Sequence, residues 1–292
     1  VVQIAVEPKT QAEMDKLSAS LDKLAEEDPT FQVTTDENSG QTIIAGMGEL
    51  HLDIIIDRLR REFGVEINVG SPQVTYKESF TETVTHREVY KKQTGGKGKF
   101  ADIEFEIGPA DEGVVGLQFI NDVKGGNIPR EYILAAEKGF KSALSNGVLA
   151  GFPMDSMKVR LYDGSTHPVD SDSLSFEVAA QLGFKASGAK AKPVVMEPIM
   201  KVEVRVPAEY LGDVTGDLNR RRAMLREVEA NSVIQIVKAD APLSEMFGYI
   251  TTLRTLTQGR ANFSMEFSHY ARMTDDMADV VIKKAKGTYF FF

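Results

Sequence analysis

A loop rich in glycine and lysine, from Gln93 to Phe100, is the first segment whose residue types suggest a chemical role. Glycine lets a backbone approach a phosphate closely, and lysine supplies the positive charge that binds it. The pattern is consistent with a loop that contacts RNA. A flexible hairpin connection explains the same composition equally well, because glycine also provides the backbone angles that tight turns need. The residues concerned are Gly95, Gly96, Lys97, Gly98 and Lys99.

The second candidate is a histidine in a segment of turn-forming residues. Ser165, Thr166 and His167 lie between Asp163-Gly164 and Pro168. An exposed histidine can stack on a base or bond to an RNA backbone. A solvated turn residue is the simpler interpretation, and the residues alone favour it. Structural roles are predicted for the other three histidines, which are His51, His86 and His269.

Three consecutive arginines, Arg220, Arg221 and Arg222, follow an expected helix. Cations at the C-terminus of a helix are favourable, and that could explain one of them. Consecutive side chains point in different directions, so all three cannot serve this purpose. We therefore expect these arginines to bind phosphate.

No phosphate loop for GTP is present in this sequence. That motif has the form Gly-x-x-x-x-Gly-Lys-Ser/Thr before a helix, whereas the glycines at 95–98 have a different spacing and precede an expected strand. The string Asp213-Val214-Thr215-Gly216 resembles a short GTPase signature, but it falls within an expected helix. No carboxylate pair or serine motif indicates acid–base or nucleophilic catalysis. We expect no catalytic site and no cofactor in this chain.

Composition excludes several other classes. The chain has 292 residues, enough for two or three domains, and 42% of them are hydrophobic, as in globular proteins. It has no cysteine, which excludes disulfides and thiolate metal sites, and its four histidines lack metal-ligand spacing. No apolar run or signal peptide is evident, so the expected location is the cytoplasm. The net charge of −9 argues against a general nucleic-acid binder and favours contact at local basic points.

The order of expected elements predicts an α+β protein with the same motif at both ends. Alternating strands and amphipathic helices follow the order βαββαβ in residues 1–73, where Thr10 and Glu13 suggest a capping box. The same order returns in 196–274, which predicts two ferredoxin-like domains. Residues 74–195 form a different domain with strands near 83–92, 100–107, 117–123 and 157–162 and two helices. A final helix and tail occupy 275–292.

Several strings together resemble bacterial elongation factor G. In order they match its third, fourth and fifth domains, and the resemblance covers essentially the whole chain. The middle domain is then ribosomal-protein-like in fold. The strings are Gly46-Met47-Gly48-Glu49-Leu50-His51-Leu52, Tyr162-Asp163-Gly164-Ser165, Gly212-Asp213-Val214-Thr215-Gly216-Asp217-Leu218 with Arg220-Arg221-Arg222, and Met265-Glu266-Phe267-Ser268-His269-Tyr270.

The resemblance implies a ribosome-binding role in the GTP-driven movement of tRNA and mRNA. Loops 93–100 and 163–170, with His167, would form a tip at the decoding site, and the arginines 220–222 would meet large-subunit RNA. The final helix would pack on the middle domain. GTP and Mg²⁺ would be bound by a domain absent here. The partners would be ribosomal RNA of both subunits, tRNA and mRNA, and the protein would be a monomer.

Two alternatives and some departures remain. A paralogue for ribosome recycling or antibiotic protection would share these domains, although His167 after Tyr162-Asp163-Gly164-Ser165 favours the translocase. A small-molecule kinase would need a phosphate loop before a helix, which Gly125-Gly126-Asn127 matches poorly. The chain begins at Val1 within an expected strand, which indicates a piece of a longer protein. The aromatic tail 289–292 matches no motif.

Overall fold

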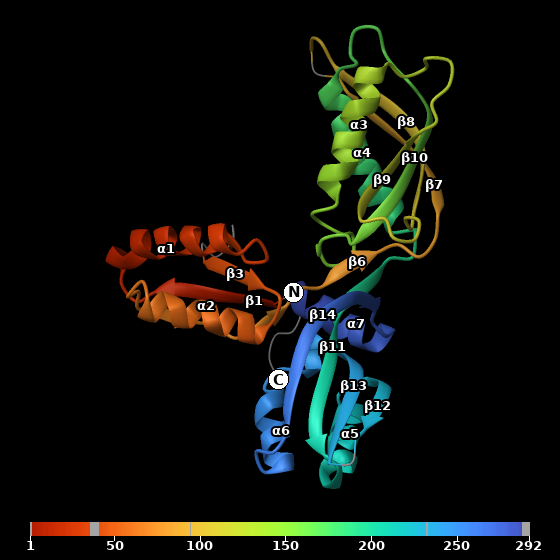
Figure 1. The fold of residues 1–292 in the computed structure, drawn as a ribbon. Helices are drawn as coiled ribbons and strands as arrows, with labels where there is room; N and C mark the ends of the chain where they lie inside the picture. The colour runs from red at the N-terminus through yellow and green to blue at the C-terminus, as the bar shows by residue number, and fades with distance from the viewer. Residues whose placement is uncertain (1, 36–40, 94, 232, 288–292) are drawn as a thin grey trace. The chain divides into compact units, whose positions relative to one another are not determined.

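The computed structural model describes residues 2–35, 41–93, 95–231 and 233–287 (Figure 1). Contacts divide the chain into two compact units. One unit contains the chain up to Thr75 together with Glu197–Ala271, and the other contains Tyr76–Met196 and the chain from Arg272 onward. Among the described residues, no helix has the length and hydrophobicity required to span a membrane.

The N-terminal domain has the predicted βαββαβ order, with strands in the sheet order β2-β3-β1-β4. This is the ferredoxin-like arrangement. Short β5 adds to β1. The elements are β1 (Val2–Pro8), α1 (Met14–Glu27), β2 (Gln32–Thr35), β3 (Thr42–Gly46), α2 (Glu49–Arg61), β4 (Ile67–Val69) and β5 (Gln73–Val74).

Helical periodicity accounts for the core of this domain. Leu17, Leu21 and Leu24 on α1 are fully buried, as a face with three- and four-residue spacing requires. The capping box predicted at Thr10 and Glu13 is wrong in detail. The side chain of Thr10 makes no cap hydrogen bond, because a 3₁₀ turn at Gln11–Glu13 precedes the α-helix. The turn expected at 38–40 lies outside the described residues.

The C-terminal domain repeats the same topology. Its sheet order is β12-β13-β11-β14, so both ferredoxin-like predictions are confirmed. Inward-facing Val202, Val204 and Val206 on β11 are fully buried, as strict alternation predicts. The elements are β11 (Val194–Pro207), α5 (Leu211–Arg220), β12 (Met224–Ala230), β13 (Ile234–Pro242), α6 (Tyr249–Thr257) and β14 (Asn262–Arg272).

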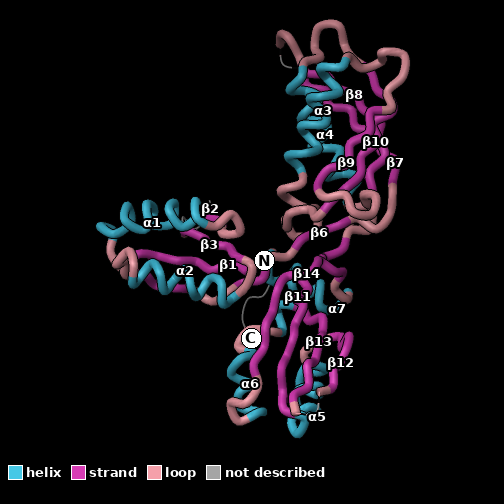
Figure 2. Tube along the Cα trace, viewed as in Figure 1, coloured by secondary structure: helices cyan, strands magenta, loops and turns pink. Residues whose placement is uncertain are grey.

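The middle domain contains one mixed sheet packed against two helices. Strands follow the order β7-β8-β10-β9, and only β9 and β10 are parallel, as expected for strands joined through a helix. Figure 2 shows α3 and α4 lying together beside this sheet, and Phe105, Phe140 and Phe176 are buried there. The elements are β7 (Val84–Lys92), β8 (Lys99–Gly108), β9 (Gly116–Asn121), α3 (Arg130–Ala143), β10 (Ser156–Ser165) and α4 (Ser173–Gly188).

The compact unit that contains the middle domain also contains β6 (Lys77–Ser79) and α7 (Asp275–Ala285). Strand β6 pairs with the first residues of β11. Its Glu78 is fully buried, and its carboxylate accepts backbone hydrogen bonds from Leu149, Ala150 and Phe152. Ala278 of α7 contributes to a small apolar cluster that also contains Val195 and Met273. Partly buried Tyr76, Leu149, Phe152, Met277, Val281 and Ile282 pack against that cluster.

Candidate functional site

Two loops that are about seventy residues apart in sequence meet at one end of the middle domain. We call residues 93–100 and 163–172 the paired loops, of which Thr94 lies outside the described residues. Figure 1 shows the β7–β8 and β10–α4 connections at the same end of this domain as the β9–α3 connection. Asn127 of that third connection donates to the Asp163 carboxylate at 2.9 Å. The structure therefore brings together both predicted groups of tip residues.

Asp170 is the principal link between the paired loops. Its side chain is buried, and its two carboxylate oxygens accept hydrogen bonds from the Gly98 amide at 3.0 Å and the Gln93 side chain at 2.8 Å. Its backbone carbonyl accepts from the Phe100 amide at 3.0 Å. The Asp170 carboxylate therefore gives hydrogen-bond acceptors to the Gly98 amide and the Gln93 side chain, which a partly buried turn would otherwise leave without partners.

The His167 ring is held from one side. Its Nδ1 accepts hydrogen bonds from the backbone amides of Val169 at 3.2 Å and Asp170 at 3.0 Å. The Phe100 ring lies beside it, with centroids 6.1 Å apart. A nitrogen that accepts two N–H bonds carries no hydrogen, so the neutral ring has its hydrogen on Nε2. The side chain is 48% exposed, and among the described residues none bonds to Nε2, which is available as a donor.

The predicted loop residues differ in what they can contact. Gly95, Gly96 and Lys97 are exposed, and Lys97 has no ion-pair partner within the described ranges. Gly95 has a φ of 54°, which glycine tolerates without strain. Gly98 is buried, and a Cβ there would lie 2.6 Å from the Lys92 carbonyl oxygen. Glycine is therefore required at 98 by packing, whereas Gly95 and Gly96 leave the backbone open to a ligand.

Lys99 is committed to an internal ion pair with Asp172, at 2.5 Å between Nζ and Oδ2. Asp172 also caps α4 by accepting from the Ser175 amide. Burial disfavours the charged carboxylate, but the hydrogen bonds from Lys99 and Ser175 outweigh burial and lower the pKa of Asp172 to about 2. The Lys99 charge is thus partly neutralised within the protein, unlike that of Lys97.

Ser165 closes β10 and bonds inward. Its hydroxyl donates to Asp102 at 2.7 Å, and Asp102 also accepts two hydrogen bonds from the Arg87 guanidinium. Burial opposes ionisation of Asp102, yet the bonds from Arg87 and Ser165 lower its pKa. Thr166 is half-buried between Ser165 and His167. Ser165 therefore supports the paired loops, and His167 and Lys97 are the side chains best placed to meet a partner.

The three arginines after α5 have separate environments. Arg222 bonds to both oxygens of the buried Glu197 carboxylate and to Glu245. Arg221 bonds to Asp217, to the Glu245 carbonyl and to Thr252, and it lies over the Tyr249 ring. Only Arg220 is mainly exposed, at 74%. Arg221 and Arg222 therefore stabilise the domain through carboxylates and a carbonyl, which leaves Arg220 as the arginine of this run most open to a phosphate.

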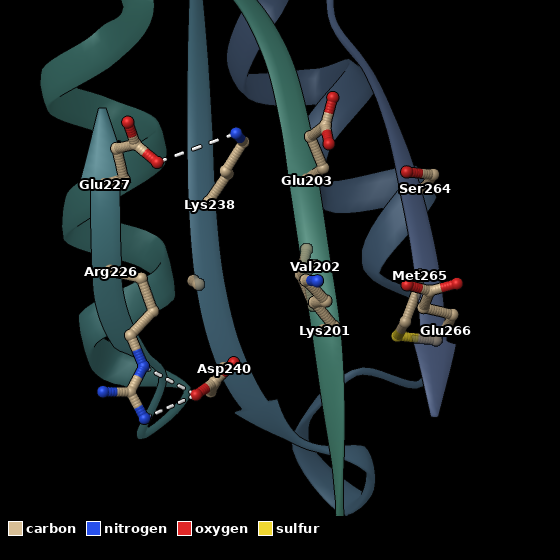
Figure 3. A pocket seen from close by; sticks show the side chains of 11 residues that line it. Lys201, Val202, Glu203, Arg226, Glu227, Lys238, Asp240, Ser264, Met265 and Glu266 are labelled. Atoms are coloured by element: carbon tan, nitrogen blue, oxygen red, sulfur yellow. Dashed lines mark hydrogen bonds and ion pairs between the residues drawn. The ribbon is translucent and has the colours of Figure 1, made fainter. Parts of the chain in front are cut away.

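A shallow groove of about 570 Å³ lies on the sheet of the C-terminal domain (Figure 3). Arg226 pairs with Asp240, and Lys238 pairs with Glu227 on the neighbouring strand. Lys201 and Glu203 of β11 and Glu266 of β14 also line it. Opposite charges on adjacent strands neutralise one another, which is typical of a solvated sheet face. Among the described residues, no group of three or more acidic or histidine side chains could hold a metal ion.

Comparison with known proteins accounts for this arrangement. Family models described as "Elongation Factor G, domain III", "Elongation factor G, domain IV" and "Elongation factor G C-terminus" match residues 1–71, 72–192 and 194–281. Together they cover nearly the whole chain in the expected order. The chain belongs to the elongation factor G family.

Relatives within the elongation factor G family are closely similar. Elongation factor G of Amoebophilus asiaticus is 59% identical over 99% of this chain, and that of Cytophaga hutchinsonii is 57% identical over 99%. The chain spans 41% of the length of each. A crystal structure of a protein from Thermus thermophilus matches with a TM-score of 0.78 and 38% identity, over 98% of this chain and 42% of that one.

Contacts of Gly46 and His51 explain two residues of the string 46–52 that resembles elongation factor G. His51 Nδ1 accepts from the Met47 amide, and its Nε2 lies 2.6 Å from the Asp28 carboxylate. A Cβ at Gly46 would lie 2.6 Å from the His51 ring, so glycine leaves room for that side chain. Hydrogen bonds from Thr30, supplemented by His51, lower the pKa of Asp28. His51 therefore joins α2 to the end of α1, as a structural residue does.

Sequence reasoning missed the carboxylates that assemble the paired loops. Residue patterns do not single out Asp102, Asp170 or Asp172, although each holds a residue that they do single out. The available signal was the acidic string Asp170-Ser171-Asp172 directly before a helix, in which the last residue is a favoured N-cap. The partner of Asp170 lies more than seventy residues away, and no local pattern reveals that pairing.

Proposed function

We propose that this chain is the ribosome-binding portion of a translation factor that promotes GTP-dependent movement of tRNA and mRNA. The observation that carries the proposal is the match of residues 1–71, 72–192 and 194–281 to three consecutive elongation factor G domains. GTP and Mg²⁺ belong to a part of the relatives that this chain does not span. As a translation factor it works in the cytoplasm, as a monomer.

The paired loops are the proposed contact with RNA at the decoding site. Exposed Gly95, Gly96 and Lys97 offer an open backbone and a positive charge that no described residue pairs, and His167 of the other loop offers its Nε2 hydrogen. Phosphate oxygens and base edges accept such donors. Gly98, Lys99, Ser165 and Thr166 serve mainly to shape this surface. In the C-terminal domain, Arg220 is the arginine proposed to meet large-subunit RNA, since its guanidinium is the exposed one.

This role requires position and charge and no bond-making chemistry in the chain itself. The middle domain acts as a wedge whose tip occupies space needed by a tRNA moving backward. GTP hydrolysis elsewhere in the complete factor supplies the free energy. The Lys99–Asp172 and Arg87–Asp102 pairs stiffen the tip, which a wedge requires.

Chemical footprinting of ribosomal RNA with this chain bound at low salt tests the proposal. Protection at both the decoding site and the factor-binding RNA of the large subunit is expected. The same chain carrying Lys97→Ala and His167→Ala should lose the decoding-site protection and keep the other. If neither site is protected, even with the complete factor, the proposed function is wrong.

A further inference from the structure

Asp170 bonds to the other of the paired loops through both its side chain and its main chain. Its carboxylate is buried, yet its hydrogen-bond donors among the described residues are the neutral Gly98 amide and the Gln93 side-chain amide. His167 Nδ1 is 3.7 Å from Asp170 Oδ2, but it accepts two backbone hydrogen bonds and so donates none to that carboxylate. A buried carboxylate held by neutral donors is costly to maintain, which points to a specific role.

The backbone of Asp170 connects the same groups. Its amide donates to His167 Nδ1 at 3.0 Å, and its carbonyl accepts from Phe100 at 3.0 Å. Phe100 in turn places its ring beside His167. One residue thus fixes the glycine loop through its side chain and the histidine ring through its main chain. Displacing the Asp170 side chain should release both together.

Gly98 shows how close this contact is. A Cβ at Gly98 would lie 3.1 Å from Asp170 Oδ2 and 2.6 Å from the Lys92 carbonyl oxygen. The approach of the two loops therefore depends on the absence of a side chain at 98 as well as on the carboxylate at 170. Ser171 adds a second connection, because its hydroxyl donates to the Phe100 carbonyl at 2.8 Å and accepts from the His167 amide.

We propose that Asp170 is a positioning residue that holds His167 and the glycine loop 95–98 in one fixed arrangement for RNA contact. This inference rests on the proposed function of the paired loops. Asp170 does not meet RNA itself, since its side chain is buried. It sets which His167 nitrogen faces outward and keeps Lys97 on the same surface. Loss of the carboxylate should therefore impair the tip as strongly as loss of the histidine.

The ring nitrogens of His167 report directly on this arrangement. In the chain labelled with ¹⁵N-histidine, the neutral His167 ring should give the signals of a single form protonated at Nε2. Asp170→Ala should convert these to the averaged signals of two tautomers. Asp170→Asn should retain the single form, because its Oδ1 can still accept from Gly98 and its amide can bond to a rotated Gln93 amide. An unchanged ring signal in Asp170→Ala would overturn the proposal.

Translocation by the complete factor supplies the functional comparison. Asp170→Ala should slow translocation by about tenfold, the effect of losing hydrogen bonds to a charged group. Asp170→Asn keeps these hydrogen bonds, so its translocation rate should stay within about twofold of the parent rate. Asp170→Ala should slow translocation less on a His167→Ala background than on the parent, since the part of its effect that acts through His167 is already lost and only the part that acts through the glycine loop remains. Multiplicative effects would contradict positioning.

Control variants distinguish a loss of positioning from a general loss of stability and from a failure of the proposed function. Val159→Ala, in the core of the same domain, should lower stability without changing the His167 signals. If Asp170→Ala does not fold, Gly98→Ala disturbs the same contact from the other loop, and unchanged ring signals there would overturn the proposal. If His167→Ala has no effect on translocation while the ring signals respond to Asp170, positioning stands and the proposed function of the tip fails.

Discussion

Arg222 donates two hydrogen bonds to the buried Glu197 carboxylate, from Nη1 at 3.0 Å and from Nη2 at 3.2 Å. Its Nε bonds to Glu245 at 3.2 Å. Arg222 also has a φ of 59°, in the left-handed region that residues other than glycine seldom adopt. The strained backbone and the ion pair occur at one residue, so the side-chain contacts offset the cost of the conformation.

Replacing Arg222 with alanine should lower the free energy of unfolding by about 3 kcal/mol, because Glu197 would remain buried without its partner. Denaturant unfolding of the chain measures this change. Arg220→Ala is the matched control from the same arginine run, and its exposed side chain predicts a change of less than about 0.5 kcal/mol. Equal losses from the two variants would contradict the assignment of Arg222 as structural.

The two lysines of the glycine loop should differ in their contribution to ribosome binding. Lys97 is exposed without an internal partner among the described residues, whereas Lys99 is paired with Asp172. Lys97→Ala should weaken association and reduce the salt slope of binding by about one unit, as for one lost phosphate contact. Lys99→Ala should change that slope less. Titrations at several salt concentrations distinguish the two, and a larger slope change for Lys99 would reverse the assignment.

Patterns of spacing predicted the fold well because both ferredoxin-like domains follow simple periods. Val202, Val204 and Val206 alternate on β11, and Leu17 and Leu21 follow the helical period on α1. Each element buries the face that its own residues define, so local sequence is sufficient. The same domains in the same order supported the family resemblance, which the comparisons confirm.

The candidate site was less predictable because its chemistry depends on pairing between distant segments. Composition identified Lys99 and Arg222 as cations, but could not show that Asp172 and Glu197 already occupy them. His167 could be found through the family resemblance, whereas its tautomer depends on backbone amides that only the folded turn presents. Sequence therefore located the loops, and the tertiary contacts decided which side chains remain free.

Asp172 should make stability depend on pH in the acid range. Its pKa is about 2 in the folded protein and near 3.8 when unfolded, so the folded state binds the proton less readily. Stability from this group is then complete above about pH 4 and is lost as pH falls through about 2, a total of about 2 kcal/mol. Asp172→Asn keeps an N-cap residue but removes the charge. It should be less stable than the parent at pH 7, and the difference should shrink toward pH 2. A difference independent of pH would contradict the ion pair.

A side chain at Gly147 should destabilise the middle domain, because it would collide with the Glu78 carboxylate. A Cβ there would lie 2.3 Å from the Glu78 carboxyl carbon, and that carboxylate is fixed by three backbone amides. Gly147→Ala should lower the free energy of unfolding by about 2 kcal/mol, within the range for overpacking a buried site. Gly113→Ala is a control for strain, since Gly113 has positive φ but open space around it. Its loss should be near 1 kcal/mol, about the cost of the left-handed conformation.

His167 should matter for movement and little for GTP hydrolysis. Its Nε2 hydrogen is directed outward by the two amides at Nδ1, while the chain has no GTP-binding motif for it to influence. In the complete factor, His167→Ala should slow translocation by about tenfold, equivalent to losing one or two hydrogen bonds in the rate-limiting state. Ribosome-stimulated GTP hydrolysis should stay within about twofold on the same scale. His167→Gln, which retains a side-chain N–H donor, should recover part of the rate. Parallel losses of translocation and hydrolysis would show that His167 supports docking of the whole factor and not the action of the tip.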